Sequence, residues 1–511
     1  MSKTVLHDGD DGVCLIIKDA KAKRLKTPTE TRSPVHVVYG GAHLFKAGTP
    51  QKLGEIALRS LETYAPNFVE FADAMWLKGC EALPRVGKNI SNLEKQLVKN
   101  ADKVRSGNYA AWLAWTVYHR TINKLRNDPV EDFRIDFEDG YGFRTDAEED
   151  ADTISAAREL ATAYKNNSIT QFSGFRVKSY AAETRERSVR TLKLFFDTFF
   201  QATKKKLPTN FVVTLPKITD KKEVADLCKH LKKIEKDADL KDGAIKIEIM
   251  IEHPLAVVDK KGNIALRSLI DAANGRCTSA HFGAFDYTAN LGIAASHQHL
   301  RHNACNFARQ MMLATLAPIG IRMSDSVTTQ MPVPIHKGLK LSEKERAENK
   351  RSVIAGWRLH FDHVTNSMID GFYQSWDLHP NQLVARYAAI YAFFLEAVDE
   401  QAMRLKAFIE KATQAHLTGN KFDDAATAQG LVNFFLRGID CGALTENEVA
   451  ETTDLSVGEL RSSFAVIIEG RRNGLRPIHL PTLFFQAILP YHSAHQSSLA
   501  GPVPLHTTSA A

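Results

Sequence analysis

Several features that mark particular classes of protein are missing from this sequence. Its six cysteines form no Cys-x-x-Cys pair and no zinc-like spacing, which argues against a zinc ribbon or a disulfide framework and favours a reducing compartment. No apolar run is long enough to cross a bilayer, and the first residues have no apolar core of the signal-peptide kind. We therefore expect a cytoplasmic protein without a membrane partner.

Nucleotide-binding signatures and clustered basic charge are also missing. No GxGxxG segment opens a helix, and no P-loop is present. The 511 residues carry 66 Lys and Arg against 59 Asp and Glu, and the two signs are mixed, as in KKEVADLCKHLKKIEKDADLKDG at 221–243. A nucleic-acid-binding surface needs a clustered basic patch. We expect solvated helix faces here and no nucleic-acid partner.

What the chain does contain is a regular alternation of strand and helix patterns. This alternation favours a parallel sheet covered by helices. Eight such units predict an α/β fold of the (β/α)8 or TIM-barrel type, and the absence of a GxGxxG motif disfavours an open doubly wound sheet. The predicted strands are Val35–Gly41, Phe133–Gly140, Phe172–Ser179, Phe211–Ile218, a strand that ends at Glu252, a strand that ends at Asp286, Ile319–Asp325 and Ser367–Gly371.

Changes in composition along the chain predict its domains. Residues 1–33 are polar and predict an N-terminal extension, and residues 34–412 predict the barrel, with a helical insertion after the first strand at about 65–132. In the insertion we expect Trp112, Trp115 and Tyr118 to be packing residues. Residues 413–487 predict a C-terminal helical region, and residues 488–511, poor in large apolar groups, a disordered tail.

Two acidic residues follow apolar strand patterns near the middle of the chain. The segment IKIEIMIE ends at Glu252, and TSAHFGAFD ends at Asp286. Burying an unpaired carboxylate is costly, and equivalent ends of neighbouring parallel strands point at a common spot. Mg²⁺ usually takes one or two protein carboxylates and leaves its other positions to water and substrate. The sequence therefore predicts a Mg²⁺ (or Mn²⁺) site on Glu252 and Asp286.

Other charged residues follow the remaining predicted strands, where the active sites of such barrels lie. Arg176 can hold a carboxylate with two parallel hydrogen bonds. A metal together with an arginine fixes positive charge where an enolate develops negative charge. We expect a small 2-oxo acid or an acyl thioester as substrate, with a carbon–carbon bond made or broken beside a metal-stabilised enolate. The other strand-end residues are Glu138, Asp139, Lys217, His253 and Asp325.

The motifs DFEDGYG, FRVK, LPK, MIEHP, HFGAFDYTANLG and GFYQSWDLHPNQ follow one another in this order. Together they resemble the HpcH/HpaI aldolase and citrate lyase β-subunit family of the phosphoenolpyruvate/pyruvate barrel superfamily, which also contains malate synthase. The resemblance spans residues 35–394 and is greatest to a long, uncharacterised branch of the family. The chain departs from the family pattern at two positions, with His253 after Glu252 and Lys178 after Val177.

The resemblance implies a metal-dependent carbon–carbon lyase or aldolase with Mg²⁺ on Glu252 and Asp286. It implies that Arg176 binds a substrate carboxylate or carbonyl, and that Glu138 and Asp139 lie near the metal and its waters. For Lys217 it implies an electrostatic or structural role. It also implies a homo-oligomer whose C-terminal helices cover a neighbouring site, and a CoA thioester as one possible substrate.

The expected site is then as follows, with several alternatives open. The expected catalytic residues are Arg176, Glu138, Asp139 and Lys217, and the expected substrate-binding residues are Arg176, Gly283, Asp325 and His379. For the general base, Asp325, His253 and Asp440 all remain candidates. For His297, His299 and His302 we favour packing over a second metal. Two other functions remain open: a phosphoenolpyruvate/pyruvate-type phosphoryl-transfer enzyme, and an inactive barrel with a binding role.

Overall fold

The computed structural model describes residues 32–411, 416–418, 421–423, 425–464 and 466–468. The predicted N-terminal extension, apart from its last two residues, and the predicted disordered tail lie outside the described residues. In the described part of the chain, no helix combines the length and the apolar character that a membrane span requires.

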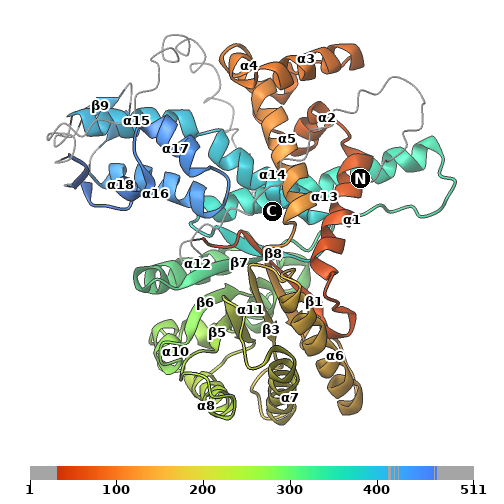
Figure 1. Ribbon diagram of the computed structural model, residues 1–511, viewed down its shortest axis with the longest axis vertical. Helices are drawn as coiled ribbons and strands as arrows, with labels where there is room; N and C mark the ends of the chain where they lie inside the picture. The colour runs from red at the N-terminus through yellow and green to blue at the C-terminus, as the bar shows by residue number, and fades with distance from the viewer. Residues whose placement is uncertain (1–31, 412–415, 419–420, 424, 465, 469–511) are drawn as a thin grey trace, which may run out of the picture. The chain divides into compact units, whose positions relative to one another are not determined.

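Eight parallel strands close into a barrel in the order of the sequence, as the prediction of a (β/α)8 fold requires (Figure 1). The barrel closes where β1 pairs with β8, with Val37 opposite Trp376. The strands are β1 His36–Gly41, β2 Asp132–Asp136, β3 Phe172–Arg176, β4 Phe211–Leu215, β5 Lys246–Ile251, β6 Cys277–Phe282, β7 Arg322–Val327 and β8 Gln374–Asp377.

Helices cover the outside of this barrel, and local sequence signals fix several of their ends. Thr145 and Glu148 form a capping box at the start of α6, and Ser342 and Glu345 form another at the start of α13. The covering helices are α6 Asp146–Lys165, α7 Arg185–Thr203, α8 Lys221–Asp237, α10 Leu266–Ala272, α12 Asn303–Leu316, α13 Glu343–Ile369 and α14 Gln382–Leu395. Shorter turns lie between them: η1 Ala42–Leu44, α9 Pro254–Val257, α11 Ala284–Asn290, η3 Ala295–His297 and η4 Ala317–Ile319.

Most predicted strand boundaries are off by a few residues, as for β2, which ends at Asp136 instead of Gly140, and two predictions are wrong outright. The segment Ser367–Gly371 is not the eighth strand: it includes the end of α13, and β8 begins only at Gln374. Apolar periodicity carries the helix through the buried Met368, and Gly371, at φ +89°, then turns the chain. Asp286 does not end a strand either, because β6 stops at Phe282 and Asp286 lies in the first turn of α11.

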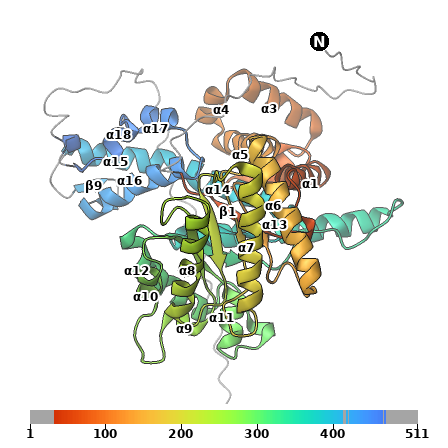
Figure 2. The same cartoon turned by 60° about the horizontal axis from the view of Figure 1, so that its bottom comes forward.

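The predicted insertion after β1 is helical. Trp112 and Tyr118 are buried, as expected for packing residues. The Tyr109 hydroxyl donates a hydrogen bond to the Leu395 carbonyl (2.6 Å), and Arg105 pairs with Asp399 (2.6 Å), so the insertion contacts the C-terminal helices. Its elements, with the preceding helix, are α1 Thr49–Tyr64, α2 Phe68–Met75, η2 Cys80–Ala82, α3 Gly87–Lys99, α4 Ala101–Gly107 and α5 Tyr109–Asn127 (Figure 2).

The described residues of the C-terminal part are mainly helical, as predicted, and residues 469–487 of the predicted helical region lie outside the described residues. After β8 the chain forms two successive helices, α14 and α15 Val398–Lys411, which are separated at residues 396–397. A short hairpin follows, made of β9 His416–Thr418 and β10 Lys421–Asp423. Three helices then complete the described chain: α16 Ala425–Asp440, α17 Glu446–Thr453 and α18 Val457–Leu460.

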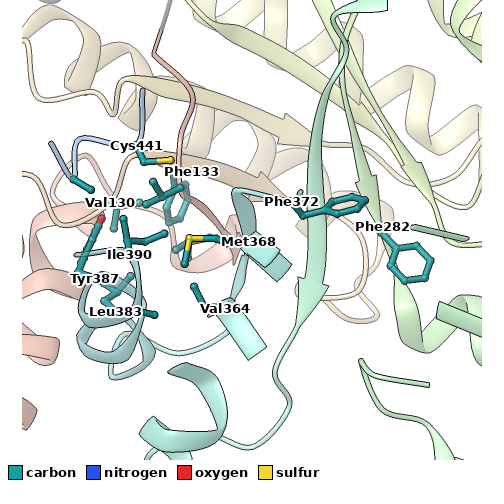
Figure 3. Close-up of a cluster of buried hydrophobic side chains, with 14 of the residues drawn as sticks. Val130, Phe133, Phe282, Val364, Met368, Phe372, Leu383, Tyr387, Ile390 and Cys441 are labelled. Carbon is teal, nitrogen blue, oxygen red and sulfur yellow. The ribbon is translucent and has the colours of Figure 1, made fainter. Parts of the chain in front are cut away.

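One continuous apolar core joins the barrel strands to these helices. Figure 3 shows a part of it, where Leu383 and Ile390 of α14 lie near Val364 and Met368 of α13. Burial of such side chains contributes about 25 cal/mol per Å² of apolar surface and dominates the stability of the fold. The outer faces of the strands therefore hold the barrel in place, and its interior can serve another purpose.

Candidate active site

Charged and polar side chains fill much of the barrel interior. Side chains alternate along a strand, so residues two or four apart share one face. Asp132, Arg134 and Asp136 therefore share the inner face of β2, and Glu248 and Glu252 share that of β5. This composition is unusual because barrel interiors are normally dominated by Val, Ile and Leu.

Glu248 is fully buried and is the centre of a hydrogen-bonded network in the middle of the barrel. Its carboxylate accepts hydrogen bonds from Tyr39 (3.1 Å), Thr214 (2.9 Å) and Ser279 (2.7 Å). It also pairs with Arg134 (3.1 Å), and His281 Nε2 lies 2.7 Å away. Burial raises the pKa of Glu248, but Arg134 and His281 outweigh it and hold the pKa well below its usual range. The carboxylate stays ionised because the network supplies its partners.

Above this network, Asp136 and Arg176 form a bidentate ion pair at the ends of β2 and β3. Arg176 Nε and Nη2 lie 2.7 and 2.6 Å from the two carboxylate oxygens of Asp136. Asp136 also accepts hydrogen bonds from the backbone N–H groups of Glu138 (3.0 Å) and Gly140 (2.7 Å). The guanidinium lies 4.9 Å from the centre of the Tyr39 ring. Asp136 thus fixes both the loop after β2 and the position of Arg176.

The remaining terminal nitrogen of Arg176 faces the loop after β2. Arg176 Nη1 lies 3.2 Å from Glu138 and 3.6 Å from Asp139, and it donates to the Met250 sulfur at 3.6 Å. The expected two-point hold of Arg176 on a substrate carboxylate therefore does not match the structure, since two of its nitrogens are bound to Asp136. Only Nη1 is placed to contact a ligand.

Lys217 follows β4 and connects the acidic residues of two loops. Its ammonium lies 2.5 Å from Glu138 and 2.7 Å from Asp139. Its backbone has φ +53°, a left-handed conformation that a residue with a side chain adopts at a cost of about 1–2 kcal/mol. In this conformation its backbone N–H donates a 2.6 Å hydrogen bond to Glu252. Strain of this kind is typical of functional sites.

Glu252 and Asp286 are brought together, as predicted, although from a strand end and a helix. Burial, opposed by Arg176 and reinforced by Asp286, raises the pKa of Glu252 to about 8. Burial also raises the pKa of Asp286; Lys217 opposes this, and Asp139 adds to it. A Cβ at Gly283 would lie 2.5 Å from the Glu252 Cβ and 2.7 Å from its Oε2, so Gly283 leaves the space that this carboxylate occupies.

The donor set fits a hard divalent cation. Five carboxylates gather here, on Asp136, Glu138, Asp139, Glu252 and Asp286, against the two cations of Arg176 and Lys217. Within the described ranges, no group of three or more His, Cys, Asp or Glu side chains is arranged to hold a metal by itself. A pair of carboxylates completed by water and substrate is the usual environment of Mg²⁺.

Other expected site residues lie apart from this cluster. Asp325 is fully buried and pairs with Arg309 of α12 (2.7 Å), so it packs toward the covering helices. His379 and His253 each accept a hydrogen bond from a backbone N–H two residues on (both 3.1 Å), and they shape the turns after β8 and β5. We therefore propose neither a substrate role for Asp325 or His379 nor a catalytic role for His253.

Two further expectations also find no place in the cluster. Asp440 ends α16, and its carboxylate lies 4.0 Å from Arg461, outside the cluster described above. His302 caps α12 by accepting a hydrogen bond from the Ala304 N–H (3.1 Å), which supports packing over metal binding.

Sequence reasoning missed Asp136, Tyr39, Arg134 and Glu248. A usable signal exists in DFRID and in IEIMIE, where charged residues recur at every second or fourth position of an otherwise apolar strand. That spacing places them on one face, and a strand whose other face is apolar must turn this face into the barrel.

Comparison with known proteins adds a family. A protein-family model described as "Domain of unknown function (DUF6986)" matches residues 17–467. No curated protein matches the sequence.

Solved structures with some similarity include three enzymes or enzyme-like proteins. A citrate lyase from Burkholderia xenovorans LB400 is 16% identical, with a TM-score of 0.47 over 67% of this chain and 93% of that chain. CitE from Mycobacterium tuberculosis, in complex with magnesium, acetoacetate and coenzyme A, is 15% identical, with a TM-score of 0.41 over 64% and 95%. A magnesium/glyoxylate complex of Haloferax volcanii malate synthase is 14% identical, with a TM-score of 0.40 over 70% and 92%. Similarity at this level says nothing about activity.

Proposed function

Because the chain belongs to the family described as Domain of unknown function (DUF6986), which carries no assigned activity, we propose a function from the site itself. We propose a Mg²⁺- or Mn²⁺-dependent carbon–carbon lyase of the aldolase or citrate lyase type. Its substrate is a 2-oxo acid or an acyl thioester, cleaved through an enolate. The observation that supports this most is the gathering of five carboxylates around Arg176 and Lys217 at the carboxyl ends of the strands.

Glu252 and Asp286 would hold the cation, which supplies Lewis-acid stabilisation of negative charge on a substrate oxygen. The residues around them determine how well this pair is prepared for binding. The Lys217 N–H and the space at Gly283 fix the Glu252 carboxylate in one position. Such fixed groups need little reorganisation when charge develops, which is the main source of electrostatic catalysis.

Arg176 and Glu138 supply the remaining chemistry. Arg176 Nη1 lies at the cluster with its position fixed by Asp136, so it can donate to a developing enolate oxygen. Burial raises the pKa of Glu138, although Arg176 lowers it. A carboxyl group with a raised pKa is suited to take up and return a proton.

In the direction of cleavage, the bond between the α-carbon and the hydroxyl-bearing carbon breaks. The hydroxyl proton goes to a base, for which Glu138 is our candidate, and the hydroxyl oxygen becomes a carbonyl. The electron pair of the broken bond forms the enolate, which then takes a proton at carbon. The products are a second carbonyl compound and a 2-oxo acid or acyl thioester, so atoms and electrons balance without an oxidant or a reductant.

The test is cleavage of 4-hydroxy-2-oxo acids and of malyl- and citramalyl-thioesters with and without Mg²⁺ or Mn²⁺. We expect cation-dependent cleavage of at least one series, and we expect Asp286→Asn to reduce kcat/KM by roughly 10²–10³-fold while the protein stays folded. Asp271→Asn is the matched control, because Asp271 is an exposed acid of α10 that pairs with Arg267. A wild-type protein inactive on every substrate, or an Asp286→Asn variant as active as the control, would overturn the proposal.

A further inference from the structure

The upper end of the barrel interior has an apolar part as well as the charged cluster. Val37, Met250, Val327 and Trp376 form a separate buried cluster, with Tyr39 and Phe285 packed against it as partly buried neighbours. We call these six residues the apolar wall. Val38 belongs to the main core outside the strands, and side chains alternate along β1, so Val37 and Tyr39 on either side of it face the interior of the barrel.

Two members of the apolar wall, Val327 and Trp376, lie at the same end of the barrel as the charged cluster, whereas Val37 is the second residue of β1. Trp376 pairs in register with Val37 on β1 and with Val327 on β7, so the three lie side by side on neighbouring strands. Val327 is the last residue of β7, and Trp376 is the last but one of β8. Active sites of such barrels form at this end.

The apolar wall borders the charged cluster directly at Arg176. The Met250 sulfur lies 3.6 Å from Arg176 Nη1. The Tyr39 ring lies 4.9 Å from the Arg176 guanidinium on one side and 4.6 Å from the Trp376 ring on the other. A ligand that reaches Arg176 Nη1 therefore has the side chains of Met250 and Tyr39 next to it.

The charged cluster offers little to a substrate with several carboxylates. Arg176 is held by Asp136 through two nitrogens, and Lys217 is held by Glu138 and Asp139. A second carboxylate on the substrate would meet acids and apolar side chains instead of a cation. Leaving such a charge buried without a partner is strongly unfavourable.

One polar atom of the apolar wall is without a partner. Trp376 Nε1 is buried and has no hydrogen-bond partner in the described part of the chain, and the residue is 9% exposed. Buried N–H groups are nearly always paired, and an unpaired one costs the protein stability. An acceptor oxygen on a bound ligand would satisfy this donor.

From these contacts we infer that the substrate has one anionic end and one uncharged hydrocarbon group, with the hydrocarbon group packed on the apolar wall and an oxygen atom accepting from Trp376 Nε1. This inference rests on the proposed function. It selects 4-hydroxy-2-oxo acids with an alkyl or aryl group at C4, whose C1 carboxylate is the anionic end. Cleavage of the C3–C4 bond then releases an uncharged aldehyde instead of an aldehyde that carries a carboxylate.

The experiment compares wild-type kcat/KM for substrates that differ only in the group on the hydroxyl-bearing carbon: methyl, isopropyl, phenyl or carboxylate. Both the 2-oxo acid and the thioester series are measured with Mg²⁺. We expect the best of the uncharged groups to exceed carboxylate by roughly tenfold or more, the scale on which an apolar pocket discriminates between ligands. Cation-dependent cleavage that prefers the carboxylate would overturn this inference and leave the proposed function standing. No cleavage in either series would overturn both.

Two variants locate the selectivity in the apolar wall. Val327→Arg, whose long side chain can carry its charge toward water, is expected to shift the preference toward the carboxylate substrate by at least roughly tenfold. Trp376→Phe keeps an aromatic ring and removes the N–H, and it should raise KM several-fold more than it lowers kcat. Trp76→Phe is its control, because Trp76 is 70% exposed in the insertion. An unchanged substrate preference in folded Val327→Arg, or an unchanged KM in Trp376→Phe, would contradict the assignment. If a variant fails to fold, the wild-type ratio of kcat/KM for uncharged and carboxylate substrates decides the question.

Discussion

The two faces of the same eight strands carry opposite kinds of residue. The outward side chains, such as Ile135, Phe175 and Val213, are fully buried and apolar, and they belong to the continuous core. The inward side chains include Arg134 and Glu248, which are as well buried but charged. Equal burial with opposite chemistry shows that burial alone does not define a core in this protein.

This difference assigns separate tasks to the two faces. Apolar packing contributes stability in proportion to the area buried, whereas buried ion pairs often contribute no more than well-packed apolar residues of the same volume. A protein selected for stability alone would fill the barrel with Val, Ile and Leu. The charged interior is therefore best explained by chemistry at the carboxyl ends of the strands, with the Glu248 network supporting it from below through Tyr39 and Arg134.

The largest expected effect comes from breaking the outer face. Phe175 of β3 is fully buried and stacks on Phe195 of α7 at 4.1 Å between ring centres. Phe175→Ala should lower the free energy of unfolding by about 3–5 kcal/mol, measured by denaturant titration. Phe143→Ala, which removes an exposed ring, should change it by less than about 0.5 kcal/mol. Similar losses in the two variants would show that the outer core does not hold the fold.

A smaller effect is expected at Gly283, where an added Cβ would occupy the space of the Glu252 side chain. In Gly283→Ala the new Cβ would collide with Glu252, so the carboxylate must move, and cation affinity should fall about 10–100-fold, the usual cost of disturbing the support of a metal ligand. Gly87→Ala is the control, since a Cβ there meets nothing within 4 Å. Calorimetric titration with Mg²⁺ measures both, and equal affinities would show that Glu252 is not a ligand.

How much of the fold and of the site could be predicted from the sequence differs between the outer and the inner faces of the strands. Outward apolar residues and helix caps such as Thr145 are local signals, and the order of strands and helices followed from them. Glu252 and Asp286 were recognised as a pair because an acid after an apolar run is conspicuous.

The partners of the charged residues could not be predicted, because they come from distant strands. Nothing local in FRVK shows that Asp136 occupies two nitrogens of Arg176, or that Asp325 turns outward to Arg309. The prediction that a strand ends at Asp286 is wrong because the apolar run before it is not strand throughout. The chain turns into α11 at Gly283, three residues before Asp286.

The smallest effect concerns Lys217, the strained residue in the loop after β4. Lys217→Gly and Lys217→Ala both remove the ammonium, but only glycine adopts φ +53° freely. The glycine variant should therefore be more stable than the alanine variant by about 1 kcal/mol in thermal or denaturant unfolding. Activity should fall equally in both, because both leave Glu138 and Asp139 without their lysine. An alanine variant as stable as the glycine variant would show that the turn carries no strain.

The raised pKa of Glu252 determines how protein stability and cation affinity should change with pH. The folded-state pKa of Glu252, about 8, lies above its ordinary value of 4.5, because burial disfavours the charged form. The stability that this carboxyl contributes is present below pH 4.5 and is lost as the pH rises through about 8. A cation that binds the ionised form must displace the proton, so its affinity should rise over the same window.

The most direct test is therefore Mg²⁺ binding measured by calorimetry from pH 6 to pH 9, in the wild type and in Glu252→Gln. We expect the wild-type Kd to fall by up to about tenfold per pH unit until about pH 8 and then level off, and we expect Glu252→Gln to bind weakly with this pH dependence removed. Wild-type protein that binds no divalent cation at any pH, or a variant that binds with the wild-type affinity and profile, would contradict the assignment of the charged cluster as a metal-dependent active site.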